Sequence, residues 1–288
     1  MRRDLVPRLL DSLERQPRGD AVIDALGRGV RALPLRGGRD LLHGRWLGHP
    51  VHPLLVQVPV GSWLSAAVLD LCPGRTREAG SLIAVGLAAA APAALAGAVD
   101  WAELHPRQQR VGLVHALANT AALGLYAASL ACRVKGRAKT GRGLGFLGLT
   151  AVAAGGLLGG HLAYRQAAGA NHAEEVPQVV SEGWHRLGPV AGFPAGRMVR
   201  RTVDDVPVLV VREADGTFHA LADRCSHLAG PLSEGTLEED GCVRCPWHGS
   251  VFRLADGWNV QGPATSPQPV FDTRVADGEL EVRLRERD

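Results

Sequence analysis

The stretch Cys225–Ser250, CSHLAGPLSEGTLEEDGCVRCPWHGS, carries two pairs of one cysteine and one histidine, written Cys225-x-His227 and Cys245-x-x-His248. Thiolate and imidazole are ligands of zinc and of iron–sulfur clusters. Zinc sites usually repeat a cysteine with a cysteine or a histidine with a histidine, whereas each pair here mixes the two residue types. The mixed pairs favour a two-iron cluster to which each loop gives one ligand per iron, with zinc binding and no metal binding as the alternatives.

Short β-rich runs surround these pairs. Strands are expected at 207–212, 217–221, 251–254, 258–260, 271–275 and 280–284. Three Asp-Gly dipeptides provide turn signals between runs, at 215–216, 256–257 and 277–278. Strands at this density predict a small antiparallel sandwich or barrel with the two pairs in its loops. His219 alternates within a strand, so we interpret it as structural rather than as a ligand.

Cys225-Ser-His227 and Cys245-Pro-Trp-His248 resemble the Rieske [2Fe–2S] signature, and the likeness extends over about residues 184–288. By that resemblance Cys225 and Cys245 bind one iron. His227 and His248 bind the other iron near the surface. The domain looks more like Rieske ferredoxins and oxygenase-associated domains than like the cytochrome bc type.

Three further residues are expected to tune such a cluster, namely Ser250, Phe252 and Pro263. Ser250 stands where bc-type proteins bond a bridging sulfide with a hydroxyl, whereas Phe252 replaces a companion tyrosine. Hydrogen bonds to cluster sulfur raise the potential, so the resemblance implies a potential between the ferredoxin and quinol-oxidising types. Pro263 matches the proline-containing loop over the cluster. Gly230 and Trp247 occupy the positions of the bc-type disulfide, so no such bridge is expected.

The first half of the chain has a different composition, rich in Ala, Gly and Leu. Four apolar runs have the length that a bilayer core requires, at 54–71, 80–99, 111–132 and 143–164. A soluble Ala-rich bundle is the alternative, but it would show a charged face at helical spacing. The fold class is therefore an all-α four-helix transmembrane bundle followed by an all-β domain. Its divisions are expected at 1–42 (basic segment), 43–170 (membrane domain), 171–183 (linker) and 184–288 (Rieske domain).

The block Gly48–Leu71, which begins GHPVHP, resembles an uncharacterised membrane family catalogued as a domain of unknown function. Further motifs that carry this resemblance lie at 98–100, 115–119 and 159–164. The resemblance covers roughly residues 43–170 and implies a four-helix membrane domain. It implies no activity.

Four spans put both chain ends on one side of the membrane, which we name the near side. Six polar residues are expected at that side: His49, His52, Asp100, His115, Asn119 and His161. Ionisable groups in a membrane are costly and suggest a site. Some of these residues are expected to bind a metal, haem or quinone, with haem ligated by His115 and His161 as one arrangement. The alternative is a hydrogen-bonded network that joins helix ends.

Charge indicates partners and location. The net charge is +3, and the first 53 residues hold ten arginines, so anionic lipid, and not nucleic acid, is the expected partner. The near side carries thirteen Lys and Arg against seven on the far side, which predicts a cytoplasmic near side in the plasma membrane. If only Arg36, Arg39 and Arg45 are counted from the N-terminal segment, the far side carries more Lys and Arg than the near side. The five cysteines form no disulfide framework, and no cleavable signal is recognised.

These features predict a membrane-anchored one-electron carrier between a membrane component, quinone or haem, and a soluble partner. About 25 residues follow the proline loop, too few for an oxygenase iron site, so no catalytic residue is expected. His227 and His248 are the expected exit edge for electrons, with Leu228 and Trp247 as an apolar docking tip. A redox or iron–sulfur sensor on a membrane domain is the alternative, and a transporter with a regulatory cluster is a third hypothesis.

Overall fold

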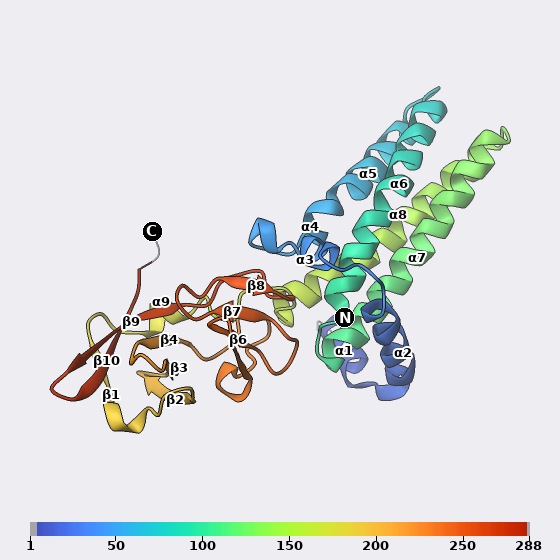
Figure 1. Cartoon of the computed structure of the whole chain (residues 1–288). Coiled ribbons are helices and arrows are strands. Elements are labelled where there is room, and N and C mark those ends of the chain that lie inside the picture. The colour runs from blue at the N-terminus through green and yellow to red at the C-terminus, as the bar shows by residue number, and fades with distance from the viewer. Residues whose placement is uncertain (1–4, 287–288) are drawn as a thin grey trace. The chain divides into compact units, whose positions relative to one another are not determined.

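The computed structural model describes residues 5–286, which form two compact units (Figure 1). The first unit runs to Arg36 and resumes at Pro50–Ala168, and the second comprises Gly37–His49 and the chain from Gly169 onward. The first is helical and the second is built on antiparallel strands. The predicted fold class is confirmed.

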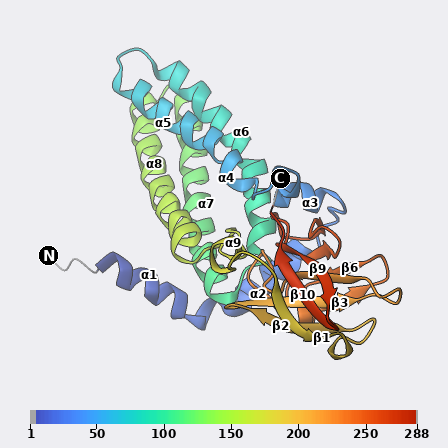
Figure 2. The same ribbon diagram turned by 90° about the vertical axis from the view of Figure 1, so that its left-hand side faces the viewer.

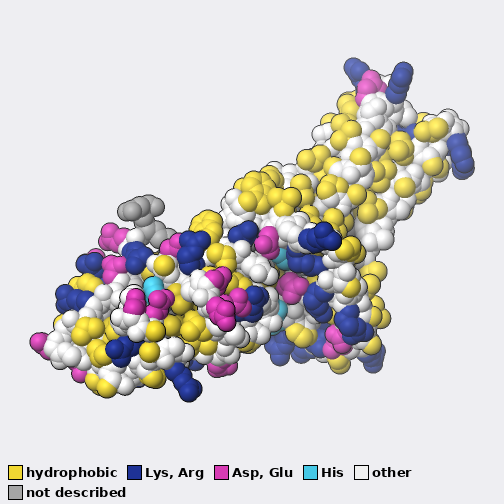
Figure 3. Space-filling view, in the orientation of Figure 1, with side chains coloured by type: hydrophobic (Ala, Val, Ile, Leu, Met, Phe, Trp, Pro, Cys, Tyr) yellow, Lys and Arg dark blue, Asp and Glu magenta, His cyan; other side chains and the backbone are white. Residues whose placement is uncertain are grey.

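Within residues 5–286, four helices are long and apolar enough to cross a membrane, all in the helical unit. The spans are His52–Leu71, Thr76–Trp101, Pro106–Val134 and Ala138–Arg165. They comprise α4 (His52–Leu55) with α5 (Gln57–Leu71), α6 (Thr76–Trp101), α7 (Pro106–Val134), and α8 (Ala138–Gly160) with a π-helical turn η3 (His161–Arg165). Apolar side chains cover the visible face of these helices, and Lys and Arg gather at their outer tip (Figure 3). Each helix continues beyond the predicted apolar run because polar residues near a membrane surface also adopt helical structure.

Small residues let these helices pack closely. The rings of Trp63 and Tyr126 stack with centroids 4.4 Å apart in the core of the bundle. Gly86 lies under the indole, and a Cβ on Gly148 would lie 3.0 Å from the Tyr126 ring. Glycine is therefore required where these two rings meet the neighbouring helices.

One buried ion pair joins α5 and α7 at the end of the bundle away from α4. Arg133 donates to both carboxylate oxygens of Asp70, at 2.8 and 2.5 Å, and both side chains are buried. Arg133 also contacts Ser129 Oγ at 3.3 Å. Because both charges have partners inside the protein, this pair is a structural link between helices.

Two helices precede the spans, α1 (Leu5–Arg15) and α2 (Asp20–Arg31), with a short 3-10 turn η1 (Pro17–Gly19) between them. This part of the chain was expected only to be a basic segment. Arg110 of α7 donates to both carboxylate oxygens of Asp20, at 2.8 and 2.6 Å, and to the Glu14 carbonyl. Arg165 donates to Asp11 at 2.5 Å. Acidic residues among the arginines therefore bind these helices to the near-side end of the bundle.

The second unit contains two antiparallel sheets. The strands are β1 (His185–Pro189), β2 (Met198–Val203), β3 (Val206–Arg212), β4 (Phe218–Ala222), β5 (Thr236–Glu238), β6 (Cys242–Arg244), β7 (Val251–Arg253), β8 (Asn259–Gln261), β9 (Val270–Ala276) and β10 (Glu279–Leu284). Their orders are β1-β10-β9-β4-β3-β2 and β5-β6-β7-β8. Figure 2 shows the larger sheet from a second side. The hairpins β7–β8 and β9–β10 were predicted, and the latter turns at Asp277 and Gly278, both with positive φ.

Two predicted boundaries differ from the packing. The linker expected at 171–183 is part of the second unit, where it forms α9 (Val176–Val179) and buries Val176 and Val180 in the hydrophobic core. Residues 43–49, expected in the membrane domain, also pack with the second unit, within α3 (Gly38–His43), the 3-10 turn η2 (Arg45–Leu47) and the residues that follow. Val176 and Val180 thus extend the hydrophobic core of the second unit beyond the strands.

Candidate metal centre

The two predicted ligand loops share one backbone arrangement. The first follows β4, and the second connects β6 to β7. In each loop the cysteine N–H donates to the carbonyl five residues further on, at 2.8 Å in both cases. The cysteine carbonyl accepts from the N–H four residues further on, at 2.8 Å from Ala229 and 3.2 Å from Gly249. Both of these residues have positive φ, 62° and 71°. The same closed turn therefore presents Cys225 and Cys245.

The two cysteine sulfurs lie together in the interior. Cys225 is 1% exposed and Cys245 is 3% exposed. Their hydrogen bond to each other and burial raise the pKa of Cys225, while that bond lowers the pKa of Cys245 to about 7. Each sulfur also accepts from the backbone N–H groups two and three residues further on, those of His227 and Leu228 and those of Trp247 and His248. These donors favour the thiolate, the form that binds metals.

The two imidazoles also lie together. The ring centroids of His227 and His248 are 5.0 Å apart and the rings are nearly perpendicular, at 89°. His227 is 8% exposed, His248 is partly exposed and Trp247 is 48% exposed. Leu228 is 4% exposed, so the predicted docking tip of Leu228 with Trp247 is wrong in part. Leu228 lies within the turn closed by the bond from the Cys225 N–H to the Gly230 carbonyl, and its side chain is buried there.

This arrangement fits the donor set of a Rieske cluster. Such a cluster takes two thiolates on one iron and two imidazoles on the other. In this unit two sulfurs form a buried pair and two imidazoles form a pair closer to the surface. Within residues 5–286 no three His, Cys, Asp or Glu side chains are grouped for one ion, and a cluster with two protein ligands per iron needs no such group.

A third loop, residues 262–264, packs against the second ligand loop. The Ser250 hydroxyl accepts from the Ala264 N–H at 3.0 Å, and Asn259 Nδ2 donates to the Ala264 carbonyl at 2.8 Å. A Cβ on Gly262, whose φ is 95°, would lie 2.7 Å from Ser250 Cα, so only glycine fits there. Pro263 is buried in this loop. The Ser250 hydroxyl uses an acceptor site in this contact and keeps its own proton to donate.

Gly230 and Trp247 stand at the two positions where no disulfide was expected, and they pack against each other. A Cβ on Gly230 would lie 2.9 Å from Cys245 Sγ and 3.1 Å from the Trp247 ring. All five cysteines are free in the structure. Cys242 is buried at the start of β6, and burial raises its pKa to about 11. A small residue under an indole therefore brings the two ligand loops into contact.

One residue that sequence analysis missed, Gln268, holds the first ligand loop from a position four residues after the third loop. The side chain of Gln268 is buried and accepts from the Ser226 N–H at 2.7 Å. Its amide nitrogen donates to the carbonyls of Ala222 and Arg224, at 2.7 and 2.8 Å. Phe252, one of the predicted tuning residues, is fully buried in the core cluster that also contains Cys225 and Cys245. No sequence signal distinguishes Gln268 from an ordinary surface glutamine.

A segment from far upstream contacts the third loop. We name residues 38–47, which form α3 and η2, the strap. Asp40 accepts from the Gly262 N–H at 3.3 Å, and Arg45 donates to the Asn259 carbonyl at 3.2 Å. Arg45 and Asp40 are also 3.7 Å apart as an ion pair. The strap thus contacts both ends of the turn between Asn259 and Gly262, which packs against the loop of Ser250.

The predicted near-side residues divide between different contacts. His49 belongs to the second unit, and the other five belong to the first. His161 Nε2 lies 2.8 Å from Glu14 Oε1, and the ring of His115 lies beside that of His52, with centroids 6.3 Å apart. The pairing of His115 with His161 that was considered for haem is therefore replaced by a pairing with His52. Asp100 lies in the last turn of α6.

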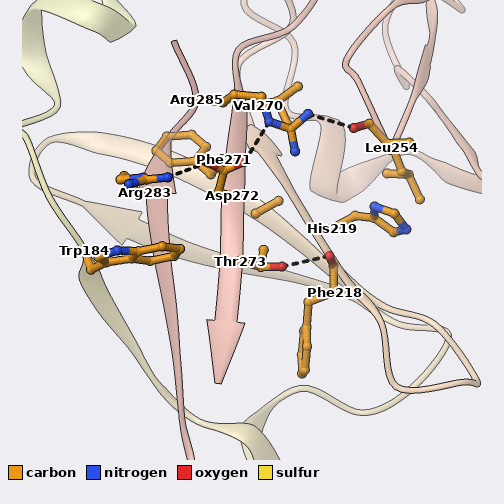
Figure 4. A pocket seen from close by; sticks show the side chains of 12 residues that line it. Trp184, Phe218, His219, Leu254, Val270, Phe271, Asp272, Thr273, Arg283 and Arg285 are labelled. Carbon is orange, nitrogen blue, oxygen red and sulfur yellow. Dashed lines mark hydrogen bonds and ion pairs between the residues drawn. The ribbon is translucent and has the colours of Figure 1, made fainter. Parts of the chain in front are cut away.

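A separate groove of about 390 Å³ lies over β4 and β9 and is lined by none of the four predicted ligands (Figure 4). Its arginines, Arg283 and Arg285, both donate to Asp272, at 3.1 and 2.7 Å. The bond from Arg285 lowers the pKa of that carboxyl. His219 contacts Glu213 at 3.0 Å. These polar groups of the groove thus already have partners within the protein.

Comparison with known proteins agrees with this geometry. A family model described as Rieske [2Fe-2S] domain matches residues 183–272. A second, described as Predicted membrane protein (DUF2231), matches residues 48–172. The 3-phenylpropionate/cinnamic acid dioxygenase ferredoxin subunit of Escherichia coli (strain K12) is 39% identical over 34% of this chain and 91% of its own length. The subunit of the same name from Shigella boydii serotype 4 (strain Sb227) is 38% identical over the same shares.

Among solved structures, the ferredoxin of carbazole 1,9a-dioxygenase from Nocardioides aromaticivorans IC177 is 26% identical, with a TM-score of 0.34. The match covers 36% of this chain and 100% of that one. The family assignment rests on the sequence matches. The C-terminal unit is a Rieske iron–sulfur domain of the ferredoxin type. The chain belongs to the Rieske family through that domain, which follows a DUF2231 membrane domain.

Proposed function

We propose that the protein is a membrane-anchored one-electron carrier that passes electrons between a redox group in the membrane and a soluble partner. A Rieske [2Fe–2S] cluster, when bound, supplies a one-electron couple. The observation that carries the proposal is the ligand arrangement, with the sulfurs buried and His248 beside the exposed Trp247. The four candidate spans in the same chain support attachment to a bilayer.

The ligand loops supply the remaining chemistry of this proposal. Cys225 and Cys245 would hold one iron, and His227 and His248 the other. Backbone N–H groups directed at both sulfurs stabilise negative charge there. The Ser250 hydroxyl has a proton to donate toward the same region, whereas Phe252 offers none. We therefore propose a potential between those of the ferredoxin and quinol-oxidising types, and a titration at the full bc-type value would contradict it.

The proposed soluble partner is an oxygenase-type redox component. The support is that the curated relatives are named as ferredoxin subunits of a dioxygenase, and this chain covers 91% of their length. Trp247 and His248 form the proposed contact edge, since an exposed aromatic residue beside a ligand is suited to docking. We further propose that this edge faces the cytoplasm, in accord with the larger number of Lys and Arg on the near side.

The proposal is tested with the full-length protein in lipid nanodiscs that contain a quinol. Cytochrome c is added as a soluble one-electron acceptor, and its reduction is followed by absorbance. Sustained reduction that requires the intact His248 supports an electron carrier. Reduction by only one electron per chain, with a change in the protease sensitivity of the bundle, would contradict it and favour a redox sensor.

A further inference from the structure

The helical unit contains a second pair of imidazoles, remote in sequence from the ligand loops. His52 begins α4 and His115 lies in α7, with ring centroids 6.3 Å apart and an angle of 80° between the planes. Each Nδ1 is 2.8 Å from a backbone carbonyl, that of Ala93 in α6 for His52 and that of Gly155 in α8 for His115. Four helices thus contribute to the position of two rings.

These carbonyl contacts determine which nitrogen of each ring has a free lone pair. A carbonyl oxygen only accepts, so each Nδ1 must carry the proton and a neutral ring presents its lone pair on Nε2. Within the described chain the structure gives His52 no other hydrogen bond. Histidines that bind metals typically donate their second ring nitrogen to a carbonyl or carboxylate in this way.

Asn119 supports the ring of His115. Its Nδ2 donates to the His115 carbonyl at 2.9 Å and lies 3.3 Å from His115 Nε2. The second contact is long for a hydrogen bond, so a metal ion can replace it while the first contact persists. Asn119 is therefore a positioning residue and not a ligand.

Glycines face this pair from the adjacent helices. A Cβ on Gly97 would lie 2.8 Å from the His52 ring, and one on Gly159 would lie 3.3 Å from His115 Cε1. A Cβ on Gly155 would lie 2.7 Å from the Asn119 amide. Any larger residue would displace these side chains, so the helix backbones fix the position of both rings.

We propose that His52 and His115 are the axial ligands of a haem. Two imidazoles are too few to hold a bare ion firmly, whereas a porphyrin brings four nitrogen donors of its own. Within the described residues no third His, Cys, Asp or Glu side chain completes a site for a bare ion. The ligand class is therefore an iron porphyrin, which requires only two side chains.

The separation of the rings favours this geometry. With a metal–nitrogen distance of about 2 Å, rings on opposite sides of one metal have centroids roughly 6 Å apart. Rings on adjacent positions of one metal come closer, as His227 and His248 do at 5.0 Å. The separation of 6.3 Å between His52 and His115 corresponds to opposite positions. This inference names the membrane redox group of the proposed function and rests on that function only for the route of electrons.

The test uses the full-length protein, produced with haem supplied and purified in detergent. We expect one haem b per chain by pyridine haemochrome, with the low-spin spectrum of two imidazole ligands. His52→Ala and His115→Ala should each lose that spectrum and most of the haem, and His115→Met should keep haem with an altered spectrum. The matched control is His161→Ala, since His161 is bonded to Glu14. Circular dichroism of each purified variant shows that the helical unit is folded, and the Rieske electron paramagnetic resonance signal shows that the β unit is intact.

Two results would overturn the haem site. One is haem-free protein with a full Rieske signal, including protein that carries extracted quinone or a bare metal instead. The other is haem content that His52→Ala and His115→Ala leave unchanged. Haem bound through both histidines without electron delivery to cytochrome c supports the site and contradicts only the proposed carrier function.

Discussion

The two histidine pairs of this chain show two ways of holding imidazoles at a fixed separation. His227 and His248 lie on loops of the β unit, with centroids 5.0 Å apart and buried cysteines beside them. His52 and His115 lie on helices of the membrane unit, 6.3 Å apart, with glycines and carbonyl oxygens beside them. The angle between ring planes is close to 90° in both pairs. The difference lies in what positions each ring.

In the β unit each ligand loop is positioned by hydrogen bonds within itself. A cysteine bonds to residues four and five positions further on, and the ligand histidine lies inside the turn so formed. In the membrane unit each ring is bonded to a helix other than its own. A loop that closes on itself keeps its geometry when a distant element moves, whereas the helical pair depends on how four helices cross. The first pair is thus fixed by local structure and the second by tertiary packing.

The strongest test of this comparison removes one pair and examines the other. We expect His248→Ala to lose the Rieske cluster completely, because one iron then retains a single protein ligand. Iron and acid-labile sulfide analysis with electron paramagnetic resonance measures the loss. The spectrum assigned to His52 and His115 should be unchanged, since the two pairs share no residue. Trp247→Phe, which changes the neighbouring side chain and no ligand, is the control and should retain the cluster.

A different outcome would break the comparison. If His248→Ala also removed the haem spectrum while the helical unit stayed folded by circular dichroism, the two pairs would not be independent. Retention of the full Rieske signal in His248→Ala would instead contradict the ligand assignment itself.

The second test concerns the contact between the two ligand loops. In Gly230→Ala the new Cβ would lie 2.9 Å from Cys245 Sγ, and overpacking of this kind costs about 1–3 kcal/mol. We expect cluster content to fall to a fraction of the wild-type value and the thermal midpoint of the β unit to decrease. Ala229→Gly is the matched control, since its φ of 62° favours glycine. Wild-type iron content in Gly230→Ala would show that the loops separate without cost.

Local patterns made much of the fold, and the pair of His227 and His248, predictable from the sequence. The Asp-Gly turn at 277–278 has positive φ at both residues, as a tight hairpin requires, and it joins β9 to β10. Four long apolar runs correspond to four candidate spans. The spacing of Cys225 with His227 and of Cys245 with His248 is a local property of two turns. Each of these signals depends on residues close in the chain.

Features that depend on distant residues were missed or assigned wrongly. Of the expected near-side histidines, His52, His115 and His161 lie in the helical unit, but their partners could not be chosen from the sequence. His161 bonds to Glu14 in a helix that the sequence analysis left out, and His115 is then paired with His52. The strap contacts the third loop, and Gln268 contacts the first ligand loop, through side chains with no local motif. These contacts depend on how the helices cross and on which distant segments of the chain pack together. Neither can be read from the local pattern of residues.

The smallest expected effect comes from changes in the strap. These should shift the potential of the cluster at His227 and His248 and leave the pair of His52 and His115 unchanged. Asp40→Asn keeps an oxygen to accept from the Gly262 N–H and removes a negative charge near the site. The cluster becomes easier to reduce when nearby negative charge is removed. We expect its potential to rise by a few tens of millivolts, below the roughly 59 mV that corresponds to a tenfold change for one electron. A spectroscopic redox titration of the full-length protein measures this shift.

Arg45→Gln provides the reciprocal variant, because it removes a positive charge from the same ion pair and should lower the potential. The two shifts must have opposite signs if charge is their cause. Equal shifts of the same sign would mean that the strap acts by holding the turn at Gly262 and not through its charges. No shift in either variant would mean that the strap has no influence on the cluster. Neither substitution should alter the spectrum of the helical pair, whose rings are bonded to other helices.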